Sequence, residues 1–303
     1  MIFYKTVSSG NDFIHINVDE CSAAGDKAAH NMTRANLAQK LCKRQTGAGA
    51  DGVVFYKIPD SLDFVDFEIF NRDGSEAELS GNGMAGLAAV LFYLHKFNPG
   101  DDVVLNTKAG RKRISYLHHA ENKFRLKIEI GIPGFQDSDS FPFLQANSKK
   151  DGSKDEYFYE GIGFYPVSVG NPHAVVVLEE NVPDEKLEQL GKKLGYAPIF
   201  PHKANVEFVI GTGGPADYEG GEHFRIVFYE RGVGRTLASS TGSAAVFAVL
   251  QKLESINDTL IIPGAAGTGE NVNVSGKKKA AIYIENSTEI VYKGIYLNVS
   301  GSK

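Results

Sequence analysis

Two stretches of small residues decide the fold: Ser80-Gly81-Asn82-Gly83 and Ser239-Ser240-Thr241-Gly242. Each runs directly into an apolar, alanine-rich segment, Met84 to His95 in the first case and Ala244 to Leu253 in the second. Apolar segments of this length predict two buried helices. Each helix therefore follows a serine, in a stretch with little side-chain bulk.

The spacing of an earlier pair of landmarks indicates an internal duplication. Gly10-Asn11-Asp12-Phe13 lies in the first half, and Gly170-Asn171-Pro172-His173 is similar to it in the second. Ser80 comes 69 positions after Asn11, and Ser239 comes 68 positions after Asn171. Near-equal offsets predict two like domains, which we expect to face each other. Because each half combines strands with one central helix, the predicted class is α+β with two pseudo-symmetric domains, and not a parallel βαβ sheet.

The remaining patterns predict strands with one further helix in the first third. The helix is expected over Asn36 to Lys43. Short runs rich in β-branched and aromatic residues predict strands over Phe13 to Val18, Val53 to Tyr56, Phe67 to Phe70, Val103 to Leu105, Arg113 to Tyr116 and Phe124 to Ile130. Two polar stretches, Ser148 to Asp155 and Gly211 to Gly221, are expected to be solvated connections, with a functional lid as the alternative.

Composition excludes several classes of function. The chain has 303 residues, 23% of them charged, and a net charge of −5, which disfavours nucleic acid or an anionic membrane as the main partner. No stretch approaches the roughly 18 apolar residues of a membrane span. Met1 to Lys5 does not begin a secretory signal, and two cysteines, Cys21 and Cys42, are too few for a disulfide framework. We therefore expect a cytoplasmic protein.

Cofactor and metal motifs are not convincing. Gly47-Ala48-Gly49-Ala50-Asp51-Gly52 matches the dinucleotide pattern, but a helix precedes it and a strand follows, which is the reverse of the required order. We interpret it as a glycine-permitted turn. His118-His119 lacks metal-ligand spacing, and no lysine stands in a pyridoxal-phosphate context. The prediction is no metal and no cofactor.

The two helix starts suggest where chemistry takes place. Unpaired backbone N–H groups and the positive end of the helix dipole make such a start suited to a carboxylate. Two starts that face each other would hold one α-carboxylate, with Ser80 and Ser239 on either face of the α-carbon. The alternative is that each serine is only an N-cap. The duplication favours a shared site.

Six stretches carry a resemblance to a known family: Gly10-Asn11-Asp12-Phe13, Asn71-Arg72-Asp73-Gly74-Ser75-Glu76, Gly81-Asn82-Gly83, Gly170-Asn171-Pro172-His173, Asn205-Val206-Glu207-Phe208 and Tyr229-Glu230-Arg231-Gly232. In this order, over nearly the whole chain to Tyr292-Lys293-Gly294, they resemble diaminopimelate epimerases. That implies an isomerase that interconverts L,L- and meso-diaminopimelate without a cofactor, for lysine and peptidoglycan precursors. It also implies a site between two domains that each wrap a sheet around a helix, and a homodimer.

The resemblance also implies domain boundaries and residue roles. The domains are expected at 1–130 and 131–289, with a last strand over 290–303 that returns to the first. His173 and Glu230 match polar side chains beside the reacting centre, with Ser80 and Ser239 at the catalytic positions. The backbone cradle for the reacting carboxylate matches Gly81, Asn82, Ser240 and Thr241. The distal end of a small zwitterionic substrate would be held by Asn11, Asn71, Asn171, Asn205, Glu230 and Arg231. Amide, carboxylate and guanidinium groups suit that task.

Ser80 and Ser239 depart from the family, which has two catalytic cysteines there. A thiol has a pKa of about 8.5 and an alcohol one nearer 15.7, so forming the anion costs on the order of 10 kcal/mol more. A serine acts only if another base takes its proton, and His173 and Glu230 are the candidates. Ala85 stands where the family commonly has Arg, and Arg235 where it usually has Glu. Cys21 and Cys42 are expected to be structural.

Three interpretations stay open. The first is a diaminopimelate epimerase in which the serines relay protons. The second is a related racemase, epimerase or dehydratase for another amino acid, such as those of the proline racemase type. The third is a non-catalytic protein that binds an amino acid. A Ser–His hydrolase is disfavoured, since no G-x-S-x-G stretch is present.

Overall fold

The computed structural model describes residues 1–23, 33–61, 63–135, 149–151, 156–211, 224–263 and 271–297. The chain divides into two compact units. Unit 1 comprises Met1–Ile128 and Asn286–Lys303, and unit 2 comprises Glu129–Glu285. The chain crosses from one unit to the other within β8 (Lys123–Gly131) and again within β19 (Ile282–Ile295).

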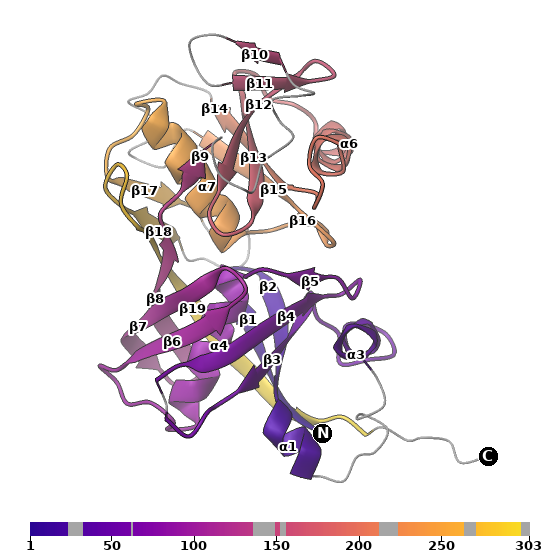
Figure 1. Cartoon of the computed structure of the whole chain (residues 1–303), viewed down its shortest axis with the longest axis vertical. Helices are drawn as coiled ribbons and strands as arrows, with labels where there is room; N and C mark the ends of the chain where they lie inside the picture. The colour runs from indigo at the N-terminus through magenta and orange to yellow at the C-terminus, as the bar shows by residue number, and fades with distance from the viewer. Residues whose placement is uncertain are drawn as a thin grey trace, which may run out of the picture. The chain divides into compact units, whose positions relative to one another are not determined.

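Unit 1 is built on a closed sheet (Figure 1). The strand order β1-β2-β3-β4-β6-β7-β8-β19 returns to its start because β19 also pairs with β1, so the strands form a barrel-like ring. The remaining strands of this ring are β1 (Ile2–Ser8), β2 (Asn11–Asn17), β3 (Gly52–Lys57), β4 (Val65–Asn71), β6 (Asp102–Thr107) and β7 (Gly110–Ala120). Closure leaves few free strand edges. The residues of β8 alternate between buried and partly buried, as expected for a strand with one face toward a core.

A helix fills the inside of this ring. Helix α4 (Gly81–Tyr93) is buried from Gly81 to Phe92, and it contacts β1, β2, β3 and β7. A helix that is apolar on all sides suits only a position enclosed by other elements. The helix begins at Gly81 rather than Met84, because Ser80 caps it and the small polar residues after Ser80 are already helical. It ends before His95, which has a left-handed φ of 52°.

Three smaller elements complete unit 1. Helix α3 (Arg34–Leu41) packs on the sheet through Leu37, Ala38 and Leu41, and its start is capped by Thr33. Helix α1 (Val18–Ala23) follows β2 directly and was not predicted, while β5 (Glu76–Ala77) pairs with β4. The glycine-rich stretch from 47 to 52 connects α3 to β3, and Gly49 has a φ of 73°. That is the turn the sequence predicted.

Unit 2 repeats this arrangement around a second helix, which is covered by a second sheet and by two strands at the end of the first sheet. Helix α7 (Ser240–Lys252) is buried from Ser240 to Leu250, and it contacts β12, β13, β14, β17 and β18. Helix α6 (Asp184–Gly195), which the sequence analysis missed, packs on β14, β15 and β16. The strands of unit 2 are β9 (Gly134–Phe135), β10 (Lys149–Asp151), β11 (Glu156–Tyr159), β12 (Ile162–Ser168), β13 (Pro172–Leu178), β14 (Asn205–Gly211), β15 (Phe224–Glu230), β16 (Gly234–Thr236), β17 (Thr259–Ile262) and β18 (Val272–Ser275).

The strand registers show the duplication residue by residue. In unit 1, β2 and β3 are parallel with Phe13 opposite Gly52, and in unit 2, β13 and β14 are parallel with His173 opposite Asn205. Counting along these strands makes His15 equivalent to Val175, Val54 to Glu207, and Asn71 to Glu230. The predicted α+β fold with two pseudo-symmetric halves, each a sheet around a central helix, is therefore confirmed.

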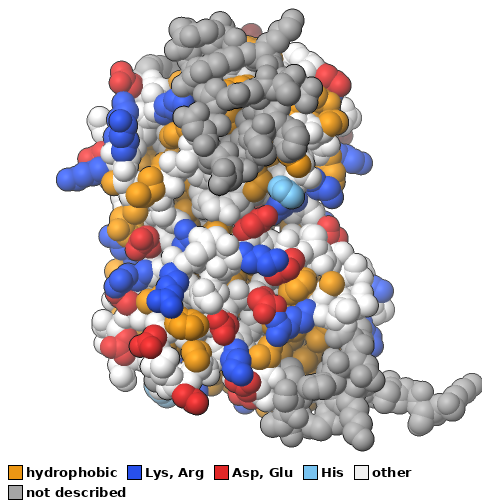
Figure 2. All heavy atoms as spheres, in the orientation of Figure 1, with side chains coloured by type: hydrophobic (Ala, Val, Ile, Leu, Met, Phe, Trp, Pro, Cys, Tyr) orange, Lys and Arg blue, Asp and Glu red, His pale blue; other side chains and the backbone are white. Residues whose placement is uncertain are grey.

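The surface carries mixed charge. On the face drawn in Figure 2, Lys and Arg side chains lie interspersed with Asp and Glu side chains. Within the ranges given above, no helix is long and apolar enough to cross a membrane. Of the two loops considered as lids, only Lys149–Asp151 in the first and Gly211 in the second are described, and all four residues belong to strands. The rest of both loops lies outside the described residues.

A buried histidine in unit 1 makes stability depend on pH. His15 Nε2 lies 2.8 Å from Thr6 Oγ1, and its Nδ1 has no hydrogen-bond partner. Burial lowers the pKa of His15 from 6.5 to about 3. The folded chain therefore holds a neutral imidazole at pH values where the unfolded chain binds a proton. Its contribution is intact above about pH 6.5 and is lost progressively as the pH falls to about 3.

We expect the double substitution Thr6→Val/His15→Val to remove this acid sensitivity. The equivalent residues in unit 2, Val167 and Val175, are both buried, so valines suit the positions. Urea unfolding of the wild type between pH 6.5 and 3 should show an added loss of about 1.4 kcal/mol per pH unit relative to the variant. If the free energies of unfolding of the two proteins changed with pH in parallel, His15 would not be the source of the acid sensitivity.

Candidate active site

Both central helices begin with the same serine cap. Ser80 has φ −144° and ψ 121°, and its Oγ accepts a hydrogen bond from Gly83 N at 3.2 Å. Ser239 has φ −143° and ψ 122°, and its Oγ accepts from Gly242 N at 3.2 Å. The cap that the sequence offered as the alternative is thus present at both positions. It leaves each hydroxyl hydrogen available, because the cap uses only a lone pair.

In unit 1, a chain of amides lies behind the first helix start. Asn82 Nδ2 donates to Asn11 Oδ1 at 2.8 Å, and Asn82 Oδ1 accepts from Asn286 Nδ2 at 3.1 Å. All three side chains are buried. Asn71 is instead the last residue of β4, and its Nδ2 donates to Ser75 Oγ in the turn that follows, at 3.0 Å. The structure therefore brings together Ser80, Asn82 and Asn11, with Gly81 between the first two.

A charge cluster supports Asn11 from the other side. Arg44 forks onto both oxygens of Asp12, at 2.9 and 3.0 Å, and contacts Asp51 Oδ1 at 2.8 Å. Lys5 pairs with Asp12 at 2.7 Å. Arg44 and Lys5 hold the pKa of Asp12 below its usual value despite its burial, while burial and the charge of Asp12 raise the pKa of Asp51. Asn11 Nδ2 lies 3.5 Å from Asp51 Oδ2, so the cluster fixes the turn that carries Asn11.

In unit 2, the serine has a carboxylate partner. Ser239 Oγ donates to Glu230 Oε2 at 3.1 Å, and Glu230 Oε1 accepts from Thr236 Oγ1 at 2.6 Å. Burial raises the pKa of the Glu230 carboxyl to about 7, although the hydrogen bonds from Thr236 and Ser239 oppose that rise. A carboxyl that titrates near neutral pH can accept a proton and release it again, which is what a general base requires.

A second polar group lies deeper in unit 2. His173 is 0% exposed, its Nδ1 lies 2.8 Å from Glu207 Oε1, and its Nε2 lies 2.9 Å from Asn171 Oδ1. Asn205 Nδ2 lies 3.4 Å from the same Nε2, and Asn205 Oδ1 accepts from the backbone N of Arg231 at 2.9 Å. Four of the predicted side chains, those of Asn171, His173, Asn205 and Glu230, thus belong to one part of unit 2.

Arg231 and the remaining helix-start residues lie beside this group. The guanidinium of Arg231 donates through Nη1 to the carbonyl of His202 at 2.8 Å. Ser240 and Thr241 are buried in the first turn of α7, immediately after Ser239. Arg235, one of the departures from the family pattern, forms an ion pair with Asp184 of α6 at 2.7 Å. Its side chain is therefore held on the outer helix.

The two helix starts differ in their chemistry. Glu230, His173 and Glu207 of unit 2 correspond by register to Asn71, Phe13 and Val54 of unit 1. Thr236 corresponds in the same way to Ala77. The backbone is repeated, but the titratable groups at these positions belong only to unit 2. The structure therefore gives Ser239 a base and gives Ser80, at the matching positions, an amide and apolar side chains.

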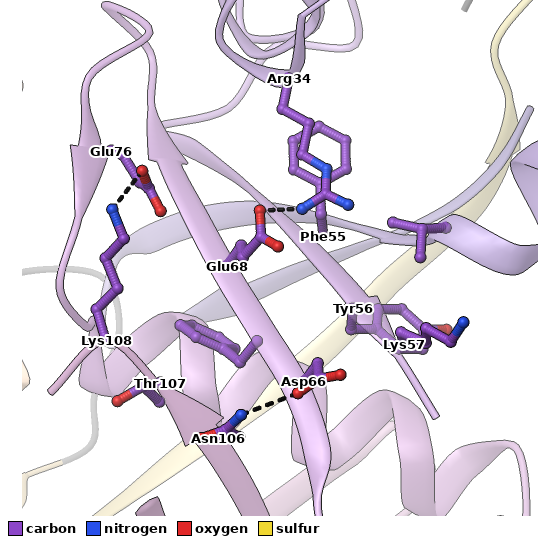
Figure 3. A pocket seen from close by; sticks show the side chains of 12 residues that line it. Arg34, Phe55, Tyr56, Lys57, Asp66, Glu68, Glu76, Asn106, Thr107 and Lys108 are labelled. Atoms are coloured by element: carbon purple, nitrogen blue, oxygen red, sulfur yellow. Dashed lines mark hydrogen bonds and ion pairs between the residues drawn. The ribbon is translucent and has the colours of Figure 1, made fainter. Parts of the chain in front are cut away.

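The structure also shows a pocket away from these residues (Figure 3). Its volume is about 610 Å³, and α1, α3, β3, β4 and β6 of unit 1 surround it. Two ion pairs join lining residues, Arg34 with Glu68 and Lys108 with Glu76 at 2.5 Å. Asp66 accepts a hydrogen bond from Asn106 at 3.0 Å, and Lys57 pairs with Asp19 outside the lining. The described residues that line this pocket include none of the predicted site residues.

The described residues offer neither a reactive cysteine nor a group of side chains that could bind a metal ion. Cys42 is buried in the core of unit 1, and burial raises the pKa of its thiol to about 12, so it is not a nucleophile. The side chain of Cys21 lies outside the described residues. Across the described ranges, no group of three or more His, Cys, Asp and Glu side chains could hold a metal ion.

Comparison with known proteins decides the family. The family model for diaminopimelate epimerase matches residues 3–133 and 165–294, which cover both central helices and both serine caps. The chain belongs to the diaminopimelate epimerase family. It is an isomerase of the type that epimerises or racemises amino acids without pyridoxal phosphate.

Individual relatives agree with this membership. The chain is 31% identical to a diaminopimelate epimerase of Methanocaldococcus jannaschii, over 99% of both chains. It is 34% identical to one of Methanocella arvoryzae, over 96% of this chain and 95% of the relative. Among solved structures, a hydroxyproline epimerase from Agrobacterium vitis with bound trans-4-hydroxy-L-proline shares the fold, with a TM-score of 0.64, 14% identity, and coverage of 97% of this chain and 91% of the other.

Two polar residues of the unit 2 group had no role in the sequence analysis. Glu207 is fully buried in β14, where all seven residues are buried, and Thr236 is the only hydroxyl in the three residues of β16. A signal for Glu207 was present, since a lone carboxylate inside Val206 to Ile210 cannot be a surface residue of a strand buried on both faces. No comparable signal marks Thr236.

We expect Thr236→Val to raise the pKa of Glu230 above about 7. The substitution removes the 2.6 Å hydrogen bond that opposes the effect of burial, while valine keeps the shape of threonine. The measurement is a carbonyl-carbon NMR titration of the glutamate carboxyls, with Glu230→Gln used to assign the signal. Thr259→Val, at an exposed position of β17, is the matched control. A pKa that stays the same or falls would show that the hydroxyl does not stabilise the carboxylate.

Proposed function

We propose that this protein epimerises diaminopimelate, converting L,L-diaminopimelate to the meso form by removing and returning the α-proton. The observation that carries the proposal is the hydrogen bond from Ser239 Oγ to Glu230, whose pKa is about 7. Family membership and relatives at 31% and 34% identity support this choice of substrate. The proposal requires that both helix starts act on one substrate molecule.

A serine hydroxyl is too weakly acidic to lose its proton by itself at neutral pH, and Glu230 can accept that proton. In the proposed step, Ser239 Oγ takes the α-proton while its own proton passes to the Glu230 carboxylate, so that no free alkoxide forms. The substrate then holds a carbanion, and Ser80 returns a proton to its opposite face. As Ser80 gives its proton, a water molecule passes one to Ser80 Oγ, and the hydroxide that remains is neutralised by the proton that Glu230 releases. One C–H bond is broken and one is formed, without oxidation or reduction.

The same residues fit a zwitterionic substrate. Backbone N–H groups at a helix start favour the reacting carboxylate, and the helix dipole stabilises the negative charge that develops next to it. We assign this cradle to Gly81, Asn82, Ser240 and Thr241. The distal amino-acid end is assigned to Asn11, Asn71, Asn171, Asn205, Glu230 and Arg231, because amides and a guanidinium can bind its carboxylate and its ammonium.

A second candidate is epimerisation of another small amino acid. A hydroxyproline epimerase of the same fold holds trans-4-hydroxy-L-proline, so the scaffold is compatible with a different substrate. The favouring observation in this chain is Arg235, which stands where the resemblance implies an acidic residue and instead pairs with Asp184. A substrate panel that includes both compounds separates the two candidates.

The first test is α-proton exchange in D₂O. We expect the purified chain to incorporate deuterium at the α-carbon of L,L-diaminopimelate and to form the meso isomer, followed by NMR and chiral chromatography. The rate should rise with pH through about 7, since Glu230 must be ionised to act as the base. Glu230→Gln should lose the exchange. Failure of the wild type to exchange the α-proton of diaminopimelate at high enzyme loading would overturn this proposal and leave an epimerase for another amino acid or a non-catalytic binding protein.

The second test replaces both hydroxyls by thiols. A thiol is about seven pKa units more acidic than an alcohol, so Ser80→Cys/Ser239→Cys should raise the exchange rate by at least about tenfold. Ser80→Ala/Ser239→Ala, which removes both proton carriers and both caps, should be inactive and less stable. A cysteine variant that still binds the substrate but exchanges no α-proton would mean that the two helix starts do not flank the α-carbon.

A further inference from the structure

The Glu207–His173 pair is costly for the fold. Both side chains are 0% exposed, and of the two oxygens of Glu207 only Oε1 has a partner, while Oε2 has none. A buried carboxylate with one unpaired oxygen loses much of its hydration energy without full compensation. Gly242 lies directly against this carboxylate, since a Cβ built there would be 2.9 Å from Oε1. The first turn of α7 therefore leaves room for it.

The equivalent positions of unit 1 show that the fold does not need such a pair. Phe13 takes the place of His173, and Val54 takes the place of Glu207, under an otherwise matching helix start. Both are buried and apolar. Because the same backbone accepts either the apolar pair or the polar pair, packing does not require His173 and Glu207. We therefore look for their role in ligand binding.

The hydrogen bonds of the pair have a fixed direction. A carboxylate oxygen only accepts, so Nδ1 of His173 carries a hydrogen toward Glu207. The backbone N of Arg231 donates to Asn205 Oδ1, so the amide nitrogen of Asn205 is the end that faces the ring. The shorter contact of Nε2, at 2.9 Å, is with Asn171 Oδ1. An amide oxygen only accepts, so in this arrangement both ring nitrogens donate, and the 3.4 Å approach of the Asn205 amide nitrogen is not a hydrogen bond. With its oxygen engaged in this way, Asn171 has its amide N–H₂ left as the free end.

We propose that Glu207 is a positioning residue for substrate binding: through His173 it fixes the amide of Asn171, so that Asn171 offers N–H to an oxygen of the substrate's distal carboxylate. This inference rests on the proposed function for the identity of the substrate. Glu207 touches neither the substrate nor Ser239. Its role is to set which end of Asn171 faces the ligand.

The test is Glu207→Gln, compared with Glu188→Gln on the exposed face of α6. Glutamine can accept or donate, so it no longer sets the direction of the hydrogen bonds. We expect KM for diaminopimelate to rise about tenfold or more, with a smaller change in kcat, since a hydrogen bond to a charged group is lost on binding. Glu207→Asp should recover part of the affinity. An unchanged KM with a lowered kcat or melting temperature would make the role structural and overturn the proposal.

A second readout does not depend on turnover. With ¹⁵N-labelled histidine, the wild type should show a hydrogen on Nε2 of His173 that exchanges slowly with solvent, and Glu207→Gln should lose or weaken that signal. His173→Phe/Glu207→Val, which copies unit 1, should remain folded and lack it, which assigns the signal. A wild-type Nε2 without hydrogen overturns the inference even if the enzyme is active. If the signal is present but no amino acid is epimerised, the proposed function fails while the positioning pair stands.

Discussion

The burial of two helix starts is the constraint on which the rest of the structure depends. The first N–H groups of any helix have no partner within the helix, and at α4 and α7 they lie among buried residues where water cannot satisfy them all. Ser80 and Ser239 satisfy one each, and the small residues that follow keep the backbone accessible. A helix can begin in this position only if it is capped in this way or if a ligand completes it. The same requirement thus explains the serines and the glycines, and an anionic ligand would meet it as well.

Duplication supplied the scaffold twice, but the two copies diverged in polarity. Unit 1 has Phe13 and Val54 under its helix start and Asn71 at the end of β4. Unit 2 has His173, Glu207 and Glu230 at the matching places, and the raised pKa of Glu230 follows from that buried setting. An isomerase that removes a proton from one face of a carbon and returns one to the other face does not require two identical groups. It requires one group that can take a proton and one that can give it.

The sequence predicted the fold well because duplication and apolar periodicity are both local signals. The two alanine-rich segments identified the central helices, and the offset of Asn11 and Asn171 identified the repeat. The helix starts were placed three or four residues too late, since small polar residues are typical of loops unless a cap is recognised. Helix α6 was missed because its charged face hid a short apolar stripe. Glu230 was named as a candidate base only through the family resemblance. Its contact with Ser239, and that of Glu207 with His173, depend on strand register, which no spacing in the chain reveals.

The path of the last strand has a consequence for biosynthesis. Thr288 to Ile295 of β19 close the ring of unit 1 by pairing with β1, whose residues are synthesised long before them. β1 must wait until β19 has been translated before its second neighbour arrives. Unit 2 has no such delay in its β10-to-β16 sheet. Folding during synthesis is therefore expected to complete the main sheet of unit 2 before the ring of unit 1, and a chain interrupted before β19 would leave β1 with an open edge exposed to aggregation.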